Sequence, residues 1–255
     1  MHRFRHVQHG NRTVYAGGCG SGRIHCKRKS DGGRSGYHYL AGTRSLALAA
    51  AGYNRGRPRR TYGKDEILHP CHSSARLQKL DRSPDHAYGI NELGTDDAQK
   101  TWDLNVTFMR ELLACAKEHD VIICFENMPM PNFSLGSVEA IRRFVREMDD
   151  DHFRVCLDTG HVNVFEGQSL YDAVIMIGDK LQTLHVHDNN GRSDEHRMPW
   201  FGGTADWEGF GRALREIGFD GVFSYETGPS RTLPLDLYGD MLRFMVKSVG
   251  YILPK

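Results

Sequence analysis

The sequence of 255 residues has little that would direct it to a membrane or crosslink it through cysteines. It contains no uninterrupted apolar run of about 18 residues, so no membrane-spanning helix is expected. The basic opening MHRFRHVQHGNR is not followed by an apolar stretch, so we expect no secretory signal and a cytoplasmic location. The six cysteines include no CxxC pair, which argues against a zinc knuckle or a disulfide framework.

Charge and hydrophobicity are unevenly distributed, although the formal net charge is only +1. Residues 1–84 hold 17 Lys and Arg against 4 Asp and Glu, whereas residues 85–255 hold 16 against 28. The first part also holds 12 of the 28 glycines and only 10 Val, Ile and Leu, too few to line several buried strands. We therefore expect two parts of different kind, with a boundary at residues 84 and 85.

Residues 1–84 allow three interpretations. The segment is a basic arm that contacts nucleic acid, a disordered extension, or the product of a frameshift or a faulty gene prediction. We favour the third, because Arg-, Gly- and Ser-rich sequence without helical or strand periodicity joins a well-patterned chain. One short stretch, ILHPCH, predicts a strand near residues 66–70 that ends at His69.

Residues 85–255 alternate between helical and strand patterns. Amphipathic helices are expected within 96–119, 137–148, 169–180, 206–219 and 236–249. Apolar runs typical of strands buried on both faces are expected within 121–127, 153–161, 181–191 and 222–228. Repeated strand–helix units predict a parallel sheet, and no Gly-rich phosphate-binding sequence follows any strand. We therefore expect an α/β fold of the (β/α)8 TIM barrel class, with an atypical N-terminal part that would leave it incomplete.

Each expected strand ends in a carboxylate or an imidazole. These residues are Glu126, Asp158, His185 and Glu226. In a barrel the carboxyl ends of all strands meet on one face, where active sites lie. Three carboxylates crowded there would repel one another unless a cation neutralised them. Oxygen-rich ligands without a thiolate favour Mn²⁺, Mg²⁺ or Co²⁺ and leave Zn²⁺ open. Such an ion would stabilise the enediolate that forms when a proton leaves the carbon beside a carbonyl.

Four motifs of the chain resemble the xylose-isomerase-like barrel superfamily, which includes sugar and sugar phosphate isomerases and epimerases, inosose dehydratase and endonuclease IV. They are, in order, CFENMP, CLDTGHVN, LHVHDNNGRSDEHRMPWFGGTADW and YETGP. The resemblance implies that the four strand-end residues bind the metal. It also implies that Glu126 and Glu226 transfer protons on the two faces of a sugar substrate.

Further residues of these motifs are expected near the substrate. By the resemblance, a second metal or the substrate would be contacted by His161, Asp194 and His196, and also by His69. His187 would point the same way as the strand-end histidine two residues before it, if the strand continues regularly. Arg192 and Arg197 could hold a phosphate or carboxylate, and Trp200 could wall the pocket against water.

The predicted function is thus a divalent-metal-dependent sugar or sugar phosphate isomerase or epimerase. It would bind a small-molecule sugar and neither nucleic acid nor a membrane, and it could form a homo-oligomer. Three alternatives stay open: an endonuclease IV-like DNA-repair hydrolase, an inosose-dehydratase-like lyase, and a catalytically inactive barrel fragment. The acidic excess of residues 85–255 disfavours DNA, whose phosphates it would repel. The unpatterned residues 1–84 favour the inactive fragment, because a sheet that lacks strands cannot close.

Overall fold

The computed structural model describes residues 79–165, 168–230 and 232–253, together with the backbone of four short strands before them. These strands are β1 (Val7–His9), β2 (Arg12–Val14), β3 (Arg23–Lys27) and β4 (Tyr37–Ala41). His69 and the strand expected near residues 66–70 lie outside the described residues. The structure therefore describes mainly the part of the chain with regular helix and strand patterns.

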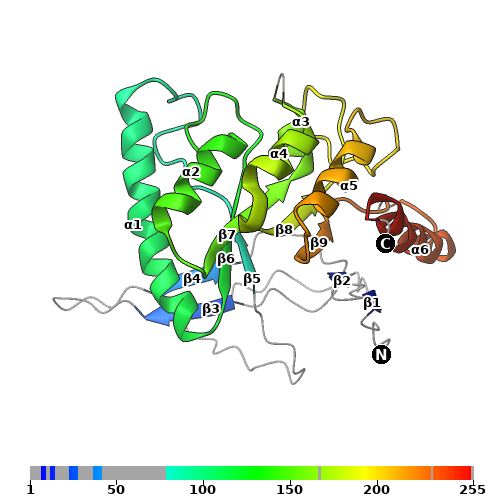
Figure 1. The fold of residues 1–255 in the computed structure, drawn as a ribbon, viewed down its shortest axis with the longest axis horizontal. Helices are drawn as coiled ribbons and strands as arrows, with labels where there is room; N and C mark the ends of the chain where they lie inside the picture. Colours follow the sequence, from blue (N-terminus) through cyan, green and yellow to red (C-terminus); the bar gives the residue numbers. More distant parts are fainter. Residues whose placement is uncertain are drawn as a thin grey trace, which may run out of the picture.

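A parallel sheet forms the centre of the molecule (Figure 1). Its consecutive parallel strands are β5 (Lys79–Arg82), β6 (Ile122–Glu126), β7 (Phe153–Asp158), β8 (Leu181–Val186) and β9 (Val222–Tyr225). The sheet continues from β9 to β2 and then to β1, which pairs antiparallel with β2, while β3 and β4 form a separate hairpin-like pair. The five parallel strands curve into half of a barrel, so all their carboxyl ends lie at one edge.

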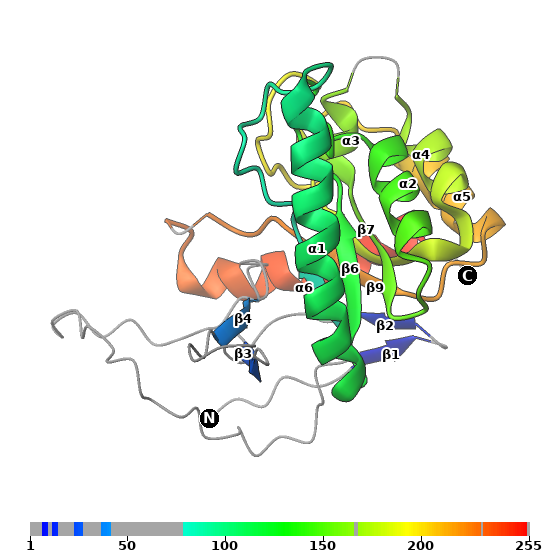
Figure 2. The same ribbon diagram turned by 90° about the vertical axis from the view of Figure 1, so that its left-hand side faces the viewer.

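Helices alternate with the parallel strands, and Figure 2 shows several of them stacked along one face of the sheet. They are α1 (Asp96–Glu118), α2 (Val138–Met148), α3 (Thr159–Asn163), α4 (Leu170–Ile177), α5 (Trp207–Glu216) and α6 (Leu235–Ile252). A 3-10 turn, Gly178–Lys180, leads into β8. All the helices and strands expected after residue 95 are confirmed, and the short α3 is an addition. No helix among the described residues is both long and apolar enough to cross a membrane.

Side chains just before the helices determine where several of them begin. Thr95, Ser137 and Ser169 each accept a hydrogen bond from a backbone N–H in the first turn of α1, α2 and α4. Asp158 does the same for α3 by accepting from the N–H of His161. Such caps satisfy N–H groups that a helix cannot pair internally. Asp158 is thereby fixed at a strand end by the backbone that follows it.

An aromatic core between sheet and helices sets which way the strand residues point. The ring centre of Phe125 in β6 lies 4.6 Å from the ring centre of Phe144 in α2 and 5.7 Å from that of Phe153 in β7. Since successive side chains of a strand point to opposite faces, Cys124 and Glu126 face away from the helices. The inner face of the half-barrel therefore receives the polar residues of the strands.

The parallel strand β5 lies just before the boundary expected at residues 84 and 85. Within β5, Asp81 is in register with Cys124, and Arg82 is in register with Phe125 of β6. The strand has one large apolar residue, Leu80, which is buried. A four-residue strand with a single apolar side chain gives no periodic signal, which is why the sequence pattern does not reveal it.

Candidate active site

Four side chains meet at the carboxyl ends of β6 to β9, and we call them the strand-end cluster. Its members are Glu126, Asp158, His185 and Glu226. Each offers one ligand atom, and these atoms lie within 4.8 Å of one another. The first three side chains are buried, and Glu226 is partly buried. The parallel ladder aligns them, because Asp158 and His185 are direct partners in adjacent strands.

One nitrogen of the His185 imidazole faces two carboxylates. Its Nδ1 is 2.9 Å from Oε1 of Glu126 and 2.9 Å from Oε2 of Glu226. Glu126 also accepts a hydrogen bond of 3.2 Å from Oγ of Ser83. Oε2 of Glu226 is buried, and no donor among the described residues makes a well-aligned hydrogen bond to it. A buried carboxylate oxygen without such a donor, beside two further carboxylates and an imidazole, fits a divalent cation.

The surroundings alter the acidity of this cluster. Burial raises the pKa of Glu226 above its ordinary value. Burial would also raise the pKa of Asp158, but the positive charge of His161 and the contact with His187 outweigh it and hold this pKa well below the usual range. The two carboxyl groups therefore differ in proton affinity although they share one site.

A second group, which we call the histidine cluster, adjoins the first. Its members are His161, His187, Asp194 and His196. Nε2 of His187 lies 2.9 Å from Oδ1 of Asp158, which joins the two clusters. Oδ2 of Asp194 lies 3.1 Å from Nε2 of His196 and 3.4 Å from Nε2 of His161. The rings of His187 and His196 stack with their centres 4.1 Å apart.

Backbone carbonyls determine where the protons of two of these histidines lie. Nδ1 of His161 is 2.7 Å from the carbonyl of Asn127, and Nδ1 of His196 is 2.8 Å from the carbonyl of Glu226. Because a carbonyl only accepts, each Nδ1 carries a proton. Burial would lower the pKa of His161, but the charge of Asp158 and the contact with Asp194 raise it to about 9. The hydrogen bond to Asp194 likewise raises the pKa of His196 to about 9.

The loop that carries Asp194 and His196 is tied to the sheet by backbone hydrogen bonds. Asp188 and Arg197 exchange two of them, at 2.7 and 2.8 Å. The backbone of His196 has a φ of 51°, in the left-handed region that a non-glycine residue seldom occupies. The contacts of the imidazole with Asp194 and Glu226 compensate for this conformation.

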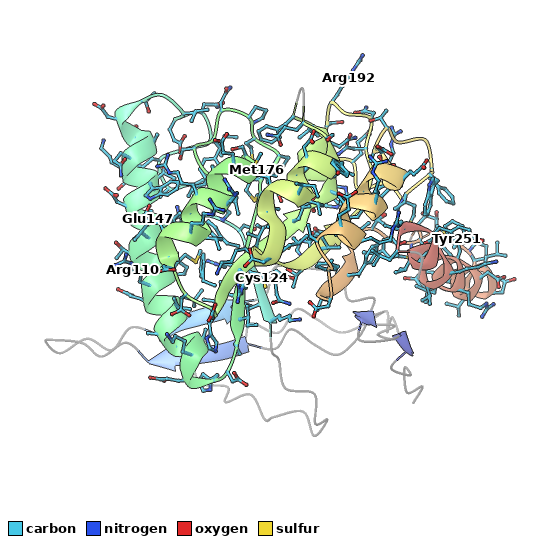
Figure 3. All side chains as sticks on the ribbon, in the orientation of Figure 1. Arg110, Cys124, Glu147, Met176, Arg192 and Tyr251 are labelled. Atoms are coloured by element: carbon cyan, nitrogen blue, oxygen red, sulfur yellow. The ribbon has the colours of Figure 1, made fainter. Side chains whose placement is uncertain are left out.

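The other residues expected near the substrate lie outside both clusters. Arg192 is exposed, and Figure 3 shows its side chain projecting away from the molecule. Arg197 donates to the carbonyl of Gly202 and to Glu195, both in its own loop. Trp200 borders a cavity of about 510 Å³ beside α6. A substrate contact by any of these three residues stays a prediction.

Sequence reasoning missed two residues beneath the strand-end cluster. Oδ2 of Asp81 lies 3.0 Å from Nε2 of His185, and Oδ1 accepts a hydrogen bond of 2.6 Å from Oγ1 of Thr183. Thr183 could have been found from its position, two residues before His185 on the same strand face. Asp81 belongs to β5, whose four residues give no periodic signal.

Asp188 directly follows His187, where the chain leaves β8 and enters the loop. In the structure its carboxylate accepts hydrogen bonds from the indole of Trp207 at 2.9 Å and from the backbone N–H groups of Asn189 and Ala205. Asp188 therefore anchors the loop and the start of α5. Among the described residues, its carboxylate forms no hydrogen bond with a histidine ring.

Comparisons with known proteins show which sequences and folds this chain is similar to. The chain is 32% identical to a D-psicose 3-epimerase of Enterocloster bolteae over 115 residues, which is 45% of this chain and 36% of the relative. The structure of D-psicose 3-epimerase with D-tagatose from Clostridium cellulolyticum H10 covers 69% of this chain and 64% of its own, with a TM-score of 0.55 at 20% identity. The IolI protein with a bound zinc atom also has a TM-score of 0.55, at 19% identity, and covers 69% of this chain and 63% of its own.

The curated relatives are longer than the part they share with this chain. The matches span 48% and 36% of the first two relatives, so the chain corresponds to about half or less of their length. A family model described as xylose isomerase-like TIM barrel matches residues 77–248. This range contains the five parallel strands and both clusters. The chain belongs to the xylose isomerase-like TIM barrel family.

Proposed function

We propose that this protein is a divalent-metal-dependent epimerase or isomerase of a ketose sugar or sugar phosphate. The observation that carries the proposal is the approach of Glu126 and Glu226 to the same nitrogen, Nδ1 of His185, at 2.9 Å each. Relatives named D-psicose 3-epimerase support the substrate class. The sugar, its phosphorylation and its stereochemistry are left open.

The strand-end cluster would hold the cation, since its four residues supply three carboxylates and one imidazole. Mn²⁺, Mg²⁺ and Co²⁺ suit such oxygen-rich ligands, and a relative in fold with bound zinc keeps Zn²⁺ open. The cation would supply Lewis acidity, which lowers the energy of negative charge that develops on a substrate carbonyl oxygen. The ordered position of His185 and the buried carboxylates make this site ready for the ion before substrate arrives.

Proton transfer is assigned to the two glutamates. One carboxylate removes the proton from the carbon beside the carbonyl, and the other returns a proton to the opposite face of the same carbon. Burial raises the pKa of Glu226, which is the direction that favours uptake of a proton. Ser83 holds one oxygen of Glu126 and leaves the other facing His185.

The histidine cluster is proposed to contact the substrate hydroxyl groups. His161 and His196 are charged near neutral pH and can donate hydrogen bonds, and His196 is partly exposed. The ligand atoms of His187, Asp194 and His196 also lie within 4.8 Å of one another, so these residues could bind a second cation. A second cation there would favour the endonuclease IV-like alternative.

The test is the metal content of the purified protein combined with turnover. We expect about one divalent ion per chain and epimerisation of at least one ketose in a panel. Glu126→Gln and Glu226→Gln should each lose about 10²- to 10⁴-fold in turnover, the usual contribution of acid–base catalysis. Glu139→Gln, an exposed glutamate in the first turn of α2, is the matched control and should keep full activity.

Three results would overturn this proposal. Three bound zinc ions with cleavage of abasic-site DNA would assign the chain to the endonuclease IV-like alternative. A folded protein that binds no divalent ion and turns over no sugar would show an inactive barrel fragment. Turnover with loss of water from an inosose would instead indicate the lyase.

A further inference from the structure

We propose that Asp81 is a positioning residue that keeps the proton of His185 on Nε2 and thereby directs the lone pair of Nδ1 toward the metal. The inference rests on the proposed function, because it concerns how one ligand of that metal is oriented. Oδ2 of Asp81 lies 3.0 Å from Nε2 of His185, on the side of the ring opposite to Glu126 and Glu226.

A neutral imidazole binds a cation only through the nitrogen that lacks a proton. An ionised carboxylate only accepts hydrogen bonds, so the Asp81 carboxylate requires a proton on Nε2. Nδ1 then carries the lone pair, and it faces Glu126 and Glu226 at 2.9 Å. The two ring nitrogens therefore have separate tasks, as in carboxylate–histidine–metal arrangements generally.

The structure also holds Asp81 in place. Asp81 is in register with Cys124 of β6, and β6 is joined through β7 to β8, the strand that carries His185. Its second oxygen, Oδ1, accepts a hydrogen bond of 2.6 Å from Oγ1 of Thr183, which is buried. Both oxygens are thus used, one by a hydroxyl and one by the imidazole.

The hydroxyl group of Thr183 would also orient the side chain of an asparagine at position 81. In Asp81→Asn the amide oxygen would keep the hydrogen bond from Thr183, so the amide NH₂ would turn toward Nε2 of His185. An NH₂ group donates, which favours the tautomer with its proton on Nδ1. That tautomer presents an N–H to the cation and cannot bind it.

The first experiment measures Mn²⁺ affinity by calorimetry on the full chain. Asp81→Asn should bind Mn²⁺ about 10- to 100-fold more weakly than the unchanged protein, the usual effect of removing such a partner. Thr183→Val alone should change the affinity by less than about 10-fold. The double variant Asp81→Asn with Thr183→Val should recover part of the loss, because the amide can turn its oxygen to Nε2. A merely structural role of Asp81 would make the double variant worse than either single variant.

The second experiment needs no substitution. In the Zn²⁺-loaded protein, ¹⁵N NMR of the histidine side chains should show a proton on Nε2 of His185 and none on Nδ1. The reverse assignment would overturn the proposal even if Asp81→Asn does not fold. A thiolate-to-metal absorption band in the Co²⁺ protein would also overturn it, because Asp81, Cys156 and His185 would then hold an ion themselves.

The outcomes separate this inference from the proposed function. If the unchanged protein binds none of Mn²⁺, Mg²⁺, Co²⁺ and Zn²⁺, both proposals fail. If it binds Mn²⁺ and turns over a ketose while Asp81→Asn binds the ion equally well, only the role of Asp81 is rejected. Thermal unfolding in EDTA checks that the Asp81→Asn protein is folded before its affinity is interpreted.

Discussion

The strand-end cluster and the histidine cluster adjoin each other and contain similar side chains, but they are held in different ways. Glu126, Asp158 and His185 belong to adjacent parallel strands, so backbone ladders fix their spacing. Asp194 and His196 belong to a loop whose path includes a left-handed residue, and they hold each other through a contact of 3.1 Å. The comparison shows that the sheet positions the first group, whereas Asp194 and His196 of the second group are held largely by their own contact.

Burial separates the two clusters further. The side chains of Asp158 and His185 are fully enclosed, whereas those of Asp194 and His196 are 27% and 39% exposed. Solvent weakens the electrostatic interactions of Asp194 and His196 more than those of the enclosed Asp158 and His185. We therefore expect substitutions in the strand-end cluster to have larger effects, and the predictions below test this order.

The largest effect is expected from Asp158→Asn, because this carboxylate belongs to one cluster and contacts the other. It accepts a hydrogen bond of 2.8 Å from the N–H of His161 and lies 2.9 Å from Nε2 of His187. Replacing it removes one of the three carboxylates that lie within 4.0 Å of the buried, charged ring of His161. Unfolding in urea should show a loss of about 3 kcal/mol, and Mn²⁺ affinity should fall more than about 100-fold.

The matched control is Asp103→Asn, an exposed aspartate on α1. It should change the free energy of unfolding by less than about 0.5 kcal/mol and leave Mn²⁺ affinity unaltered. Equal losses in both variants would contradict the central place given to Asp158.

An intermediate loss of stability is expected from Gly160→Ala, which adds a methyl group where the two clusters meet and changes no charge. An added Cβ would lie 1.9 Å from Cε1 of His187, so the ring must move away from Asp158. Overpacking of this kind costs about 1 to 3 kcal/mol. Gly239→Ala in α6 is the control, because its nearest contact is the flexible end of Arg243 at 3.7 Å. A Gly160→Ala protein as stable as the control would show that the histidine cluster is not tightly packed.

The smallest effect on stability is expected from Asp194→Asn, and it depends on pH. With Asp194 present, the pKa of His196 is raised to about 9, from an ordinary value of about 6.5. A raised histidine pKa stabilises the fold fully below pH about 6.5, and this stabilisation is lost as the pH rises through about 9. The lowered pKa of Asp194 affects stability at acidic pH, because the stabilisation that it provides is lost as the pH falls below about 4.

In the Asp194→Asn variant this pH dependence should disappear. Side-chain NMR should show the pKa of His196 falling back toward its ordinary value, while the free energy of unfolding at pH 6.5 changes by about 1 kcal/mol or less, because partly exposed ion pairs are screened. If the pKa of His196 stays near 9, the hydrogen bond to the carbonyl of Glu226 rather than Asp194 is its cause.

Much of the fold could be predicted from residue patterns alone. Trp102, Met109 and Leu113 of α1 are buried as their helical spacing predicts, and Phe125 lies in a continuous apolar run that becomes β6. These are local signals, because a period of 3.6 or 2 depends only on nearby residues. The expected boundary at residues 84 and 85 relied on composition, and the parallel strand β5 lies just before it.

The sequence by itself determined the alternation of strands and helices and the polar residue at the end of each of the four later strands. Those residues share an edge because parallel strands carry their carboxyl ends together. Only the tertiary structure decided that Asp81 lies behind His185, that Arg192 points to solvent, and that Asp194 joins His161 to His196. Such contacts join residues far apart in the chain or follow from the path of one loop, and neither leaves a periodic trace in the sequence.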